Sequence, residues 1–321
     1  MVHPIWQAYP KIESDLERVK KMMIAEISVS NPEIKAKIMD YINASGKFAR
    51  AGLVLMFARL NQKTISQEKL NIAAGIELFH LATLIHDDVI DEADQRRGIQ
   101  AFHLAESNRI AIYAGDYLLA YAMRFLYQSG LNDFSGIEQK TIELILNGEL
   151  NQLKNVADPT MTIYRYLRQI KGKTALLFGL ATVGGYQTES ISRRQLKQAY
   201  YAGEEIGMAF QLIDDQLDFF QKQEQTGKPQ LQDVMNGIYT APLIRAIYQK
   251  PILKNLILSI ENEEDLQQIQ DLIEESDADV YVENLVKKYL NKAIKRIQKL
   301  DQNDYSSEIL SLIQTLMTRD Y

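Results

Sequence analysis

Two short segments of the sequence share the pattern Asp-Asp-x-x-Asp, at Asp87–Asp91 and at Asp214–Asp218. Both lie in stretches with the apolar spacing of helices, so the first and last aspartate of each motif fall on one face, one turn apart. Carboxylates on one face repel each other unless cations lie between them, and burying them unpaired among apolar neighbours costs several kcal/mol. Mg²⁺ prefers oxygen ligands and keeps coordination positions for phosphates. The spacing therefore predicts sites for Mg²⁺ and for a phosphorylated ligand.

A single motif of this kind could equally be an acidic helix face that only contacts solvent. Two copies argue against that alternative, because average aspartate usage would give well under one copy in a chain of this length. Both copies also have Leu, Ile or Phe as neighbours, which leaves their carboxylates only partly solvated. We therefore interpret the pair of motifs as metal-binding.

Basic residues stand at the ends of several apolar helical segments, where they would line the mouth of a helical bundle. Any one of them could be a surface cation whose aliphatic stem covers apolar surface. As a set, they supply the positive charge that a phosphorylated ligand needs. These residues are Lys47, Arg50, Arg96, Arg97, Lys173 and Lys228.

The elements that must position these side chains are helices. Apolar residues recur at spacings of three and four, most clearly within 12–23, 76–87, 202–217 and 286–297. Breaks rich in Gly, Asn, Asp and Ser leave helices of roughly 15–30 residues, which is long for a globular protein. We predict an all-α fold with a single domain over 1–321, a large helical bundle with room for a deep hydrophobic cavity.

Composition excludes several classes of protein. Of the 321 residues, 46% are hydrophobic and 24% charged, which is ordinary globular composition. The absence of Cys excludes disulfides, thiolate metal sites and a Cys nucleophile, and fits a reducing cytosol. A net charge of −6 argues against nucleic acid as a partner. The first residues lack the order of a signal peptide, and the longest uncharged stretch, 174–188, is too short for a membrane span. We expect a cytoplasmic protein without stable membrane insertion.

The chain resembles the trans-isoprenyl diphosphate synthases, also called polyprenyl synthetases. The resemblance covers 46–242 and is carried by the two aspartate motifs together with Arg96-Arg97-Gly98 after the first, a combination that is highly specific. Further matching segments are Gly115–Leu118, Gly148-Glu149 with Gln152, Lys173-Thr174, Phe210-Gln211 and Gly227–Pro229.

The resemblance implies an isoprenoid-synthase bundle in which Asp87, Asp91 and Asp214 hold three Mg²⁺ ions that bridge an allylic diphosphate. It places Asp88 and Lys173 in the same catalytic set. The residues that it implies for further contacts with the allylic diphosphate are Arg96, Lys173, Thr174, Gln211 and Lys228. Those that it implies for isopentenyl diphosphate are Lys47, Arg50, His80 and Arg97.

The implied reaction is a head-to-tail condensation of isopentenyl diphosphate with the allylic diphosphate. The allylic C–O bond ionises, the isopentenyl double bond attacks the cation, and a proton is lost. Metal ions and basic side chains would stabilise the charge on the leaving diphosphate. An apolar cavity would exclude water that otherwise traps the carbocation.

The sequence departs from the family pattern at two places. The first basic motif of the family reads Gly-Lys-Arg-x-Arg-Pro, whereas Gly46–Ala51 has Phe48 in place of the middle Arg and Ala51 in place of the Pro. Ile238 stands where many members have Lys. Phe48 leaves one cation fewer for isopentenyl diphosphate. Ile238 leaves one cation fewer near the second aspartate motif.

Product length should depend on the side chains below the first motif on the same helix. Synthases that stop at fifteen carbons resemble one another in having an aromatic residue four or five positions before the motif, where this chain has Thr83 and Ala82. Phe79 would lie about 12 Å below Asp87 and could form a floor or belong to the ordinary core. We predict a product of twenty carbons or more. Other candidates for the floor are Met123 and Phe125.

Two other enzyme classes share part of this pattern. A class I terpene cyclase uses the same ionisation and a similar first motif, but has an Asn/Asp-Ser/Thr-Glu motif in place of the second. An HD-type metal phosphohydrolase would use the doublet His86-Asp87, but it also needs a histidine well upstream and a distant aspartate. The remaining histidines are His3, His80 and His103.

A third alternative concerns partners. The chain could be a subunit of a two-component synthase, in which case keeping all six aspartates marks it as the catalytic member. We expect a homodimer, as is common in the family, with a second small subunit as the alternative.

Overall fold

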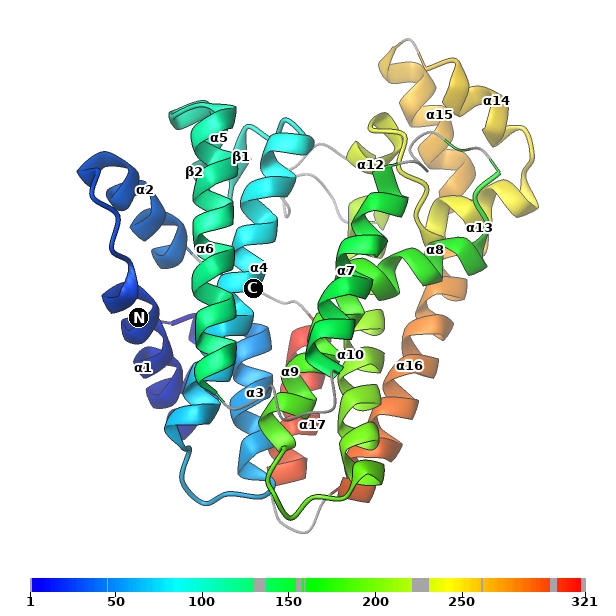
Figure 1. The fold of residues 1–321 in the computed structure, drawn as a ribbon. Helices are drawn as coiled ribbons and strands as arrows, with labels where there is room; N and C mark the ends of the chain where they lie inside the picture. Colours follow the sequence, from blue (N-terminus) through cyan, green and yellow to red (C-terminus); the bar gives the residue numbers. More distant parts are fainter. Residues whose placement is uncertain are drawn as a thin grey trace. The chain divides into compact units, whose positions relative to one another are not determined.

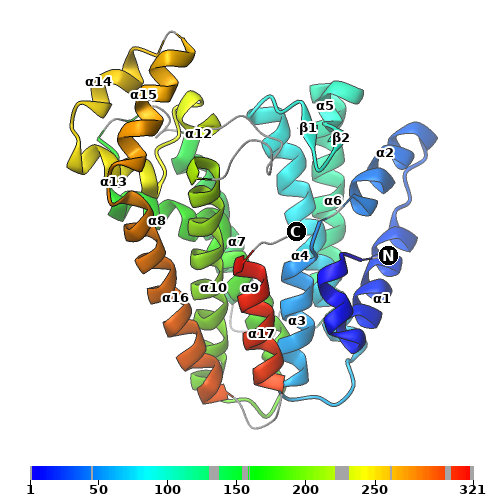
Figure 2. The same ribbon diagram turned by 180° about the vertical axis from the view of Figure 1, so that it is seen from behind.

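The computed structural model describes residues 2–44, 46–129, 137–153, 158, 160–220, 231–260, 262–300 and 305–318. The all-α prediction is confirmed: the described residues form helices and one two-stranded hairpin (Figures 1 and 2). The chain divides into two compact units. Unit 1 comprises Met1–Glu138, Leu180–Tyr200 and Leu300–Ser311, and unit 2 comprises Gln139–Gly179, Tyr201–Lys299 and Leu312–Tyr321. The single domain over 1–321 stays a prediction.

Unit 1 is built around the long helix α4, whose side chains are buried over most of its length. Figures 1 and 2 show α4 and α6 side by side. At Gly75 of α4, an added Cβ would lie 2.8 Å from Leu126 Cγ and 3.0 Å from Ala122 O. The elements of this unit are η1 (Pro4–Ala8), α1 (Pro10–Glu26), α2 (Pro32–Asn43), α3 (Ala49–Arg59), α4 (Gln67–Ile90), β1 (Gln95–Arg96), β2 (Ile99–Gln100), α5 (Phe102–Ala105) and α6 (Asn108–Gln128).

Local sequence explains where these helices begin. Asn31 accepts hydrogen bonds from the backbone of Glu33 and Ile34, with Pro32 as the first residue of α2. Ser107 caps α6 by accepting from the amide of Ile110. These caps satisfy amide groups that have no partner inside the helix.

A β-hairpin follows the first aspartate motif directly. Gln95 pairs with Gln100 and Arg96 with Ile99 in antiparallel register. The two residues between the strands, Arg97 and Gly98, both have positive φ, 53° and 76°. Positive φ at both central residues is the requirement of a type I′ turn, which matches the twist of a short hairpin. The turn presents two adjacent arginines next to the end of α4.

The start of α4 is tied to the end of α9 (Leu176–Tyr186) within unit 1. Lys69 Nζ donates to the carbonyl oxygens of Gly184 at 2.7 Å and Gln187 at 2.6 Å. Burial lowers the pKa of Lys69 to about 8. At Gly185, an added Cβ would lie 2.1 Å from Val54 O, so only glycine permits this approach of α9 to α3.

Unit 2 holds the second aspartate motif on α10 (Arg193–Phe220), which is divided between the units at Tyr200. Helices α10 and α16 are antiparallel: Glu205 pairs with Arg296 at 2.8 Å, and Gln216 bonds to Asp279 at the other end. A hydrophobic core joins α10, α13 and α16. The other elements are α7 (Ile137–Leu153), α8 (Ile163–Ile170), η3 (Lys171–Ala175), α12 (Gln232–Met235), α13 (Ala241–Gln249), α14 (Leu253–Leu258), α15 (Glu263–Glu274) and α16 (Ala278–Leu300). Helix α17 (Tyr305–Thr318) is divided between the units after Ser311.

Two glycines bring the site-bearing segments of unit 2 together. An added Cβ at Gly148 of α7 would lie 3.0 Å from the Cα of Gly172 in η3. An added Cβ at Gly207 of α10 would lie 2.6 Å from the Cα of Ala175. The segment η3 is therefore in close contact with α7 on one side and α10 on the other. Among the described residues, no helix combines the length and the apolar character needed to span a membrane.

Candidate functional site

The first motif ends helix α4 in unit 1, and its three aspartates differ sharply in exposure. Asp87 is half-buried, Asp88 is fully buried and Asp91 is exposed at the C-cap. Because 3.6 residues make a turn, Asp87 and Asp91 share a face while Asp88 points elsewhere. The structure thus separates two accessible carboxylates from one that lies in the core.

Asp88 is held by partners from two other elements. Arg96 of the hairpin donates to Asp88 Oδ1 through Nε at 2.7 Å and also through Nη2. Tyr41 of α2 donates to Asp88 Oδ2 at 3.4 Å. Burial, and next the charge of Asp88, raise the pKa of Tyr41 to about 12, so the phenol keeps its proton. The hydrogen bonds from Arg96 and Tyr41 fix the end of α4. The contact between Arg96 and the allylic diphosphate stays a prediction.

His86 precedes the motif and packs against α6. An added Cβ at Gly115 would lie 2.3 Å from His86 Nε2, so the glycine of the segment Gly115–Leu118 makes room for this ring. The same nitrogen lies 3.2 Å from Ile112 O and 3.3 Å from Asp116 Oδ1. These contacts hold the end of α4 against α6 next to Asp87.

Basic groups gather around His80 on α4. Burial lowers the pKa of His80 well below its usual value, and the charges of Arg50, Arg97 and Arg96 lower it further. The imidazole is therefore neutral near pH 7. An added Cβ at Gly46 would lie 3.1 Å from Arg97 Cζ, which places the Gly46 loop against the same guanidinium. The structure thus brings together three of the four residues expected to bind isopentenyl diphosphate.

The fourth, Lys47, lies in a loop with a strained backbone. Trp6 Nε1 donates to Lys47 O at 2.5 Å, and the Trp6 ring occupies the space above Gly52. Phe48 is 3% exposed and has φ 51°, a region that bulky residues rarely adopt. The Phe that replaces the family's Arg is therefore part of the core, where it helps fix the loop. Burial, and next the charge of Lys47, lower the pKa of His3.

The second motif, on α10 in unit 2, repeats the division seen in the first. Asp214 and Asp218 are half-buried, whereas Asp215 is buried. Tyr166 of α8 donates to Asp215 Oδ2, and Gln211 Nε2 donates to Oδ1 at 2.8 Å. Burial raises the pKa of Asp215 to about 7, although both hydrogen bonds lower it.

A further hydrogen bond extends this network to η3. Thr174 Oγ1 donates to Gln211 Oε1 at 2.7 Å. Thr174 and Gln211 were expected to touch the allylic diphosphate, and the structure places both in the chain of bonds that ends at Asp215. Their contact with substrate stays a prediction.

Lys173 lies in the same segment, which forms a π-helical turn over Lys171–Ala175. Such wider turns occur often at functional sites. Lys173 Nζ lies 3.9 Å from Glu149 Oε2 of α7. The close approach of Gly148 and Gly172 allows α7 to bring the carboxylate of Glu149 to this lysine.

The sequence did not reveal Tyr41 and Tyr166. They are separated from their aspartates by 47 and 49 residues, and nothing in their local sequence distinguishes them from the other tyrosines of the chain. A buried middle aspartate in each motif requires a donor, and that requirement was the available signal. Lys228 lies outside the described residues.

The acidic groups fit a divalent metal that shares its coordination with a ligand. Within the ranges that the structure describes, no group of three or more His, Cys, Asp or Glu side chains could hold a metal by itself. Mg²⁺ is commonly bound by one or two carboxylates together with water and substrate phosphates. The accessible pairs Asp87 with Asp91 and Asp214 with Asp218 supply such carboxylates.

Comparison with known proteins identifies the family. Residues 31–276 match the polyprenyl synthetase family. Heptaprenyl diphosphate synthase component 2 of Bacillus subtilis (strain 168) is 30% identical over 98% of this chain and 90% of its own length. The protein of the same name from Geobacillus stearothermophilus is 31% identical over 98% of each chain.

Solved structures agree with the sequence matches. The crystal structure of heptaprenyl diphosphate synthase from Staphylococcus aureus has a TM-score of 0.91 with 28% identity, covering 97% of this chain and 99% of that one. A polyprenyl synthase from Caulobacter crescentus CB15 was solved in complex with calcium and isoprenyl diphosphate. It has a TM-score of 0.89 with 27% identity, and the match covers 99% of this chain and 97% of that one. The chain belongs to the polyprenyl synthetase family and is a prenyltransferase, a polyprenyl diphosphate synthase.

Proposed function

We propose that the enzyme condenses isopentenyl diphosphate head-to-tail onto an allylic diphosphate. The proposal is carried mainly by one observation: each Asp-Asp-x-x-Asp motif buries its middle aspartate and leaves its first and last aspartates accessible. This arrangement suits carboxylates that must share ions with a diphosphate. Family membership argues against the terpene cyclase and phosphohydrolase alternatives.

Asp87, Asp91 and Asp214 would hold the divalent ions, which we propose to be three Mg²⁺. When bound, these ions neutralise charge that develops on the leaving diphosphate. Asp88 and Asp215 act through position, because their hydrogen bonds fix the ends of the helices that carry the ligands. Calcium and an isoprenyl diphosphate are named together for the Caulobacter crescentus structure, which supports a divalent metal here.

Arg50, His80 and Arg97 would bind the diphosphate of isopentenyl diphosphate, together with Lys47. Guanidinium groups form paired hydrogen bonds with phosphate oxygens. A neutral His80 can donate one further hydrogen bond without the cost of another buried positive charge. Lys173 and Lys228 would contact the allylic diphosphate and stabilise it as it leaves.

We propose a product of twenty carbons or more. Ala82, which is 1% exposed, and the half-buried Thr83 leave the space below the first motif without an aromatic ring for one turn. Phe79 is buried one turn further along α4 and is the first bulky residue on this path. Relatives named for heptaprenyl and solanesyl diphosphate support a medium or long product.

We also propose that the enzyme acts as a homodimer. Helix α6 exposes Tyr113 and Tyr127 to 75% and 74%, and α7 exposes Leu150 to 63%, and a partner subunit would remove this apolar surface from water. The Bacillus subtilis relative is named as component 2 of its synthase. A second, different subunit is therefore the alternative occupant of these faces.

Incubation with labelled isopentenyl diphosphate, allylic primers of several lengths and Mg²⁺ tests the reaction. We expect products that lengthen in isoprene steps to twenty carbons or more, and no product when EDTA removes the metal. Hydrolysis of the primer without incorporation of the label would contradict the proposal.

A further inference from the structure

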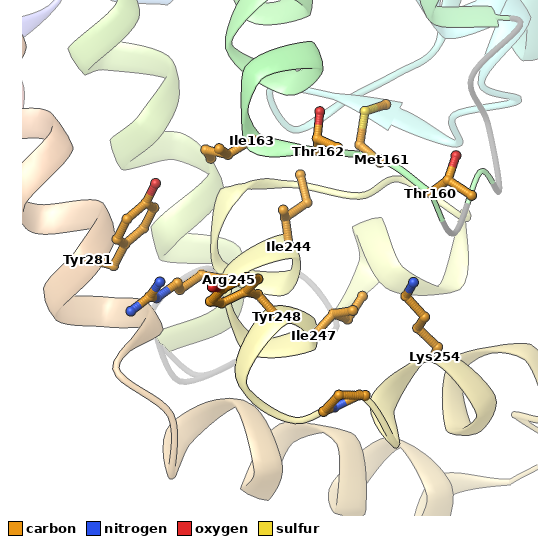
Figure 3. A pocket seen from close by; sticks show the side chains of 11 residues that line it. Thr160, Met161, Thr162, Ile163, Ile244, Arg245, Ile247, Tyr248, Lys254 and Tyr281 are labelled. Atoms are coloured by element: carbon orange, nitrogen blue, oxygen red, sulfur yellow. The ribbon is translucent and has the colours of Figure 1, made fainter.

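A pocket of about 680 Å³ lies in unit 2, and none of its lining residues is assigned above to the reaction. Its walls are the segment that leads into α8, the helix α13 with the start of α14, and Tyr281 of α16 (Figure 3). The volume is in the range of sites that bind small organic molecules. All its lining residues belong to one unit.

Most of the lining is apolar. Ile244 and Ile247 of α13 are buried, each 8% exposed. Met161, just before α8, and Ile163, its first residue, face them. Tyr248 lines the same pocket but is 78% exposed. A ligand with an apolar chain would cover this aromatic surface, and removing apolar surface from water is favourable.

The charge of the lining has one sign. Arg245 and Lys254 line the pocket, and none of the lining residues is acidic, although the chain as a whole carries a net charge of −6. Arg245 donates to both oxygens of Asp277, each at 2.6 Å. Its guanidinium also lies 4.7 Å from the ring of Tyr281 and 5.6 Å from that of Tyr248. Arg245 is therefore a neutralised part of the wall.

Lys254 is the cation that a ligand would meet. In the part of the chain that the structure describes, no carboxylate forms an ion pair with it, and the residue is exposed. Figure 3 shows Lys254 and Thr160 on one side of the pocket, Tyr281 and Arg245 on the other, and the isoleucines between them. The pocket thus has a positive end, an apolar middle and an aromatic far end.

We propose that this pocket binds an anionic amphiphile, an apolar chain that ends in a phosphate or a carboxylate. The anion would lie at Lys254, and the chain would cover Ile244, Ile247 and Tyr248. Two sources share this chemistry: a dissolved alkyl or prenyl phosphate, and the headgroup and chain of a membrane lipid. The proposal does not depend on the reaction proposed above, because no residue is shared between the two sites.

Binding of dodecyl phosphate to the full-length chain, measured by isothermal titration calorimetry, tests the site. Asp214→Ala protein in EDTA serves as the background, since it removes metal-dependent binding at the aspartate motifs. We expect saturable binding with one site per chain. Inorganic phosphate, which lacks the chain, and dodecanol, which lacks the charge, should each bind at least tenfold more weakly.

Variants at exposed positions assign the binding to this pocket. Lys254→Glu should weaken binding of dodecyl phosphate at least tenfold, and Tyr248→Ala about threefold, with unchanged thermal unfolding. Lys295→Glu removes an exposed lysine further along α16 and should leave binding unchanged. No saturable binding, or affinity that is equal in wild type and Lys254→Glu, would overturn the proposal.

A second experiment distinguishes a membrane lipid from a dissolved amphiphile as the ligand. Sedimentation with phosphatidylglycerol vesicles, and with neutral phosphatidylcholine vesicles as the control, measures binding to lipid. Binding to the anionic vesicles that Lys254→Glu abolishes would identify a membrane lipid as the ligand. Binding of dodecyl phosphate alone would identify a dissolved amphiphile.

Discussion

Asp88 and Asp215 occupy the same position in their motifs but have different partners. Asp88 has a guanidinium as its main partner, whereas Asp215 is held only by the neutral donors Tyr166 and Gln211. Burial raises the pKa of Asp215 to about 7, because the hydrogen bonds from these neutral donors, which lower the pKa, offset the loss of solvation only in part. The second motif therefore depends more on intact hydrogen bonds than the first.

Removal of the Arg96 guanidinium should reveal how much free energy the burial of an unpaired Asp88 carboxylate costs. Arg96→Met leaves a fully buried carboxylate without its ion pair, and we expect a loss of about 3–5 kcal/mol in the free energy of unfolding, measured by urea denaturation. Adding Asp88→Asn should recover part of this loss. Arg109→Met, at an exposed arginine of α6, is the control. Equal stability of Arg96→Met and this control would show that the pair does not anchor α4.

Helix α4 carries both a residue that we expect to bind substrate and residues that we expect to limit product length. The first motif ends α4, Ala82 lies between that motif and His80, and Phe79 precedes His80 directly. The periodicity of 76–87 predicted this helix and its face. It did not predict the π-turn at Lys171–Ala175 or the hairpin around Arg97, because both depend on contacts with other elements rather than on apolar spacing.

A ring placed below the motif should shorten the product. Ala82→Phe adds an aromatic side chain at a position that is 1% exposed, and chromatography of the chain lengths should show shorter products than wild type. Overpacking should cost about 1–3 kcal/mol, which thermal unfolding would register. Ala82→Ser keeps a small side chain and should leave the product unchanged. A folded Ala82→Phe variant with products of wild-type length would disprove this account of the path.

The buried ammonium group of Lys69, which joins α4 to α9, should make the free energy of unfolding depend on pH. The pKa of Lys69 is lowered from 10.5 to about 8 in the folded chain, so the unfolded chain binds more protons between these pH values. Stability should therefore rise with pH over this range, by about 3 kcal/mol relative to Lys69→Met, which cannot titrate. The measurement is urea denaturation at pH 8 and pH 10.5. Lys63→Met, at an exposed lysine, should follow wild type, and a constant difference between wild type and Lys69→Met would contradict the prediction.

Sequence reasoning was strongest for the class of fold and the family, because helical spacing recurs along the chain and the pair of aspartate motifs is highly specific. The three aspartates that we expected to hold the metal, Asp87, Asp91 and Asp214, are accessible in the structure. Sequence reasoning missed Tyr41, Tyr166 and the pocket at Lys254, since each arises where segments distant in sequence meet. Such contacts depend on how helices pack, which local pattern does not specify.

The exposed apolar faces of α6 and α7 predict the assembly. Wild type should sediment as a dimer at micromolar concentration, and Tyr113→Glu or Leu150→Glu should sediment as a monomer because each places a charge in a covered surface. Val280→Glu changes an apolar residue of α16 that is 58% exposed and should remain dimeric. A monomeric wild type would contradict a homodimer and favour a different partner subunit.

We expect both aspartate motifs to act on one diphosphate through shared divalent ions. Calorimetric titration with a non-hydrolysable allylic diphosphate analogue, with and without Mg²⁺, tests it in wild type, Asp87→Ala and Asp214→Ala, with exposed Asp94→Ala as control. We predict binding in wild type and Asp94→Ala only when Mg²⁺ is present, and a loss of at least a hundredfold in each motif variant with folding intact. Binding of wild-type strength in either motif variant would contradict the claim.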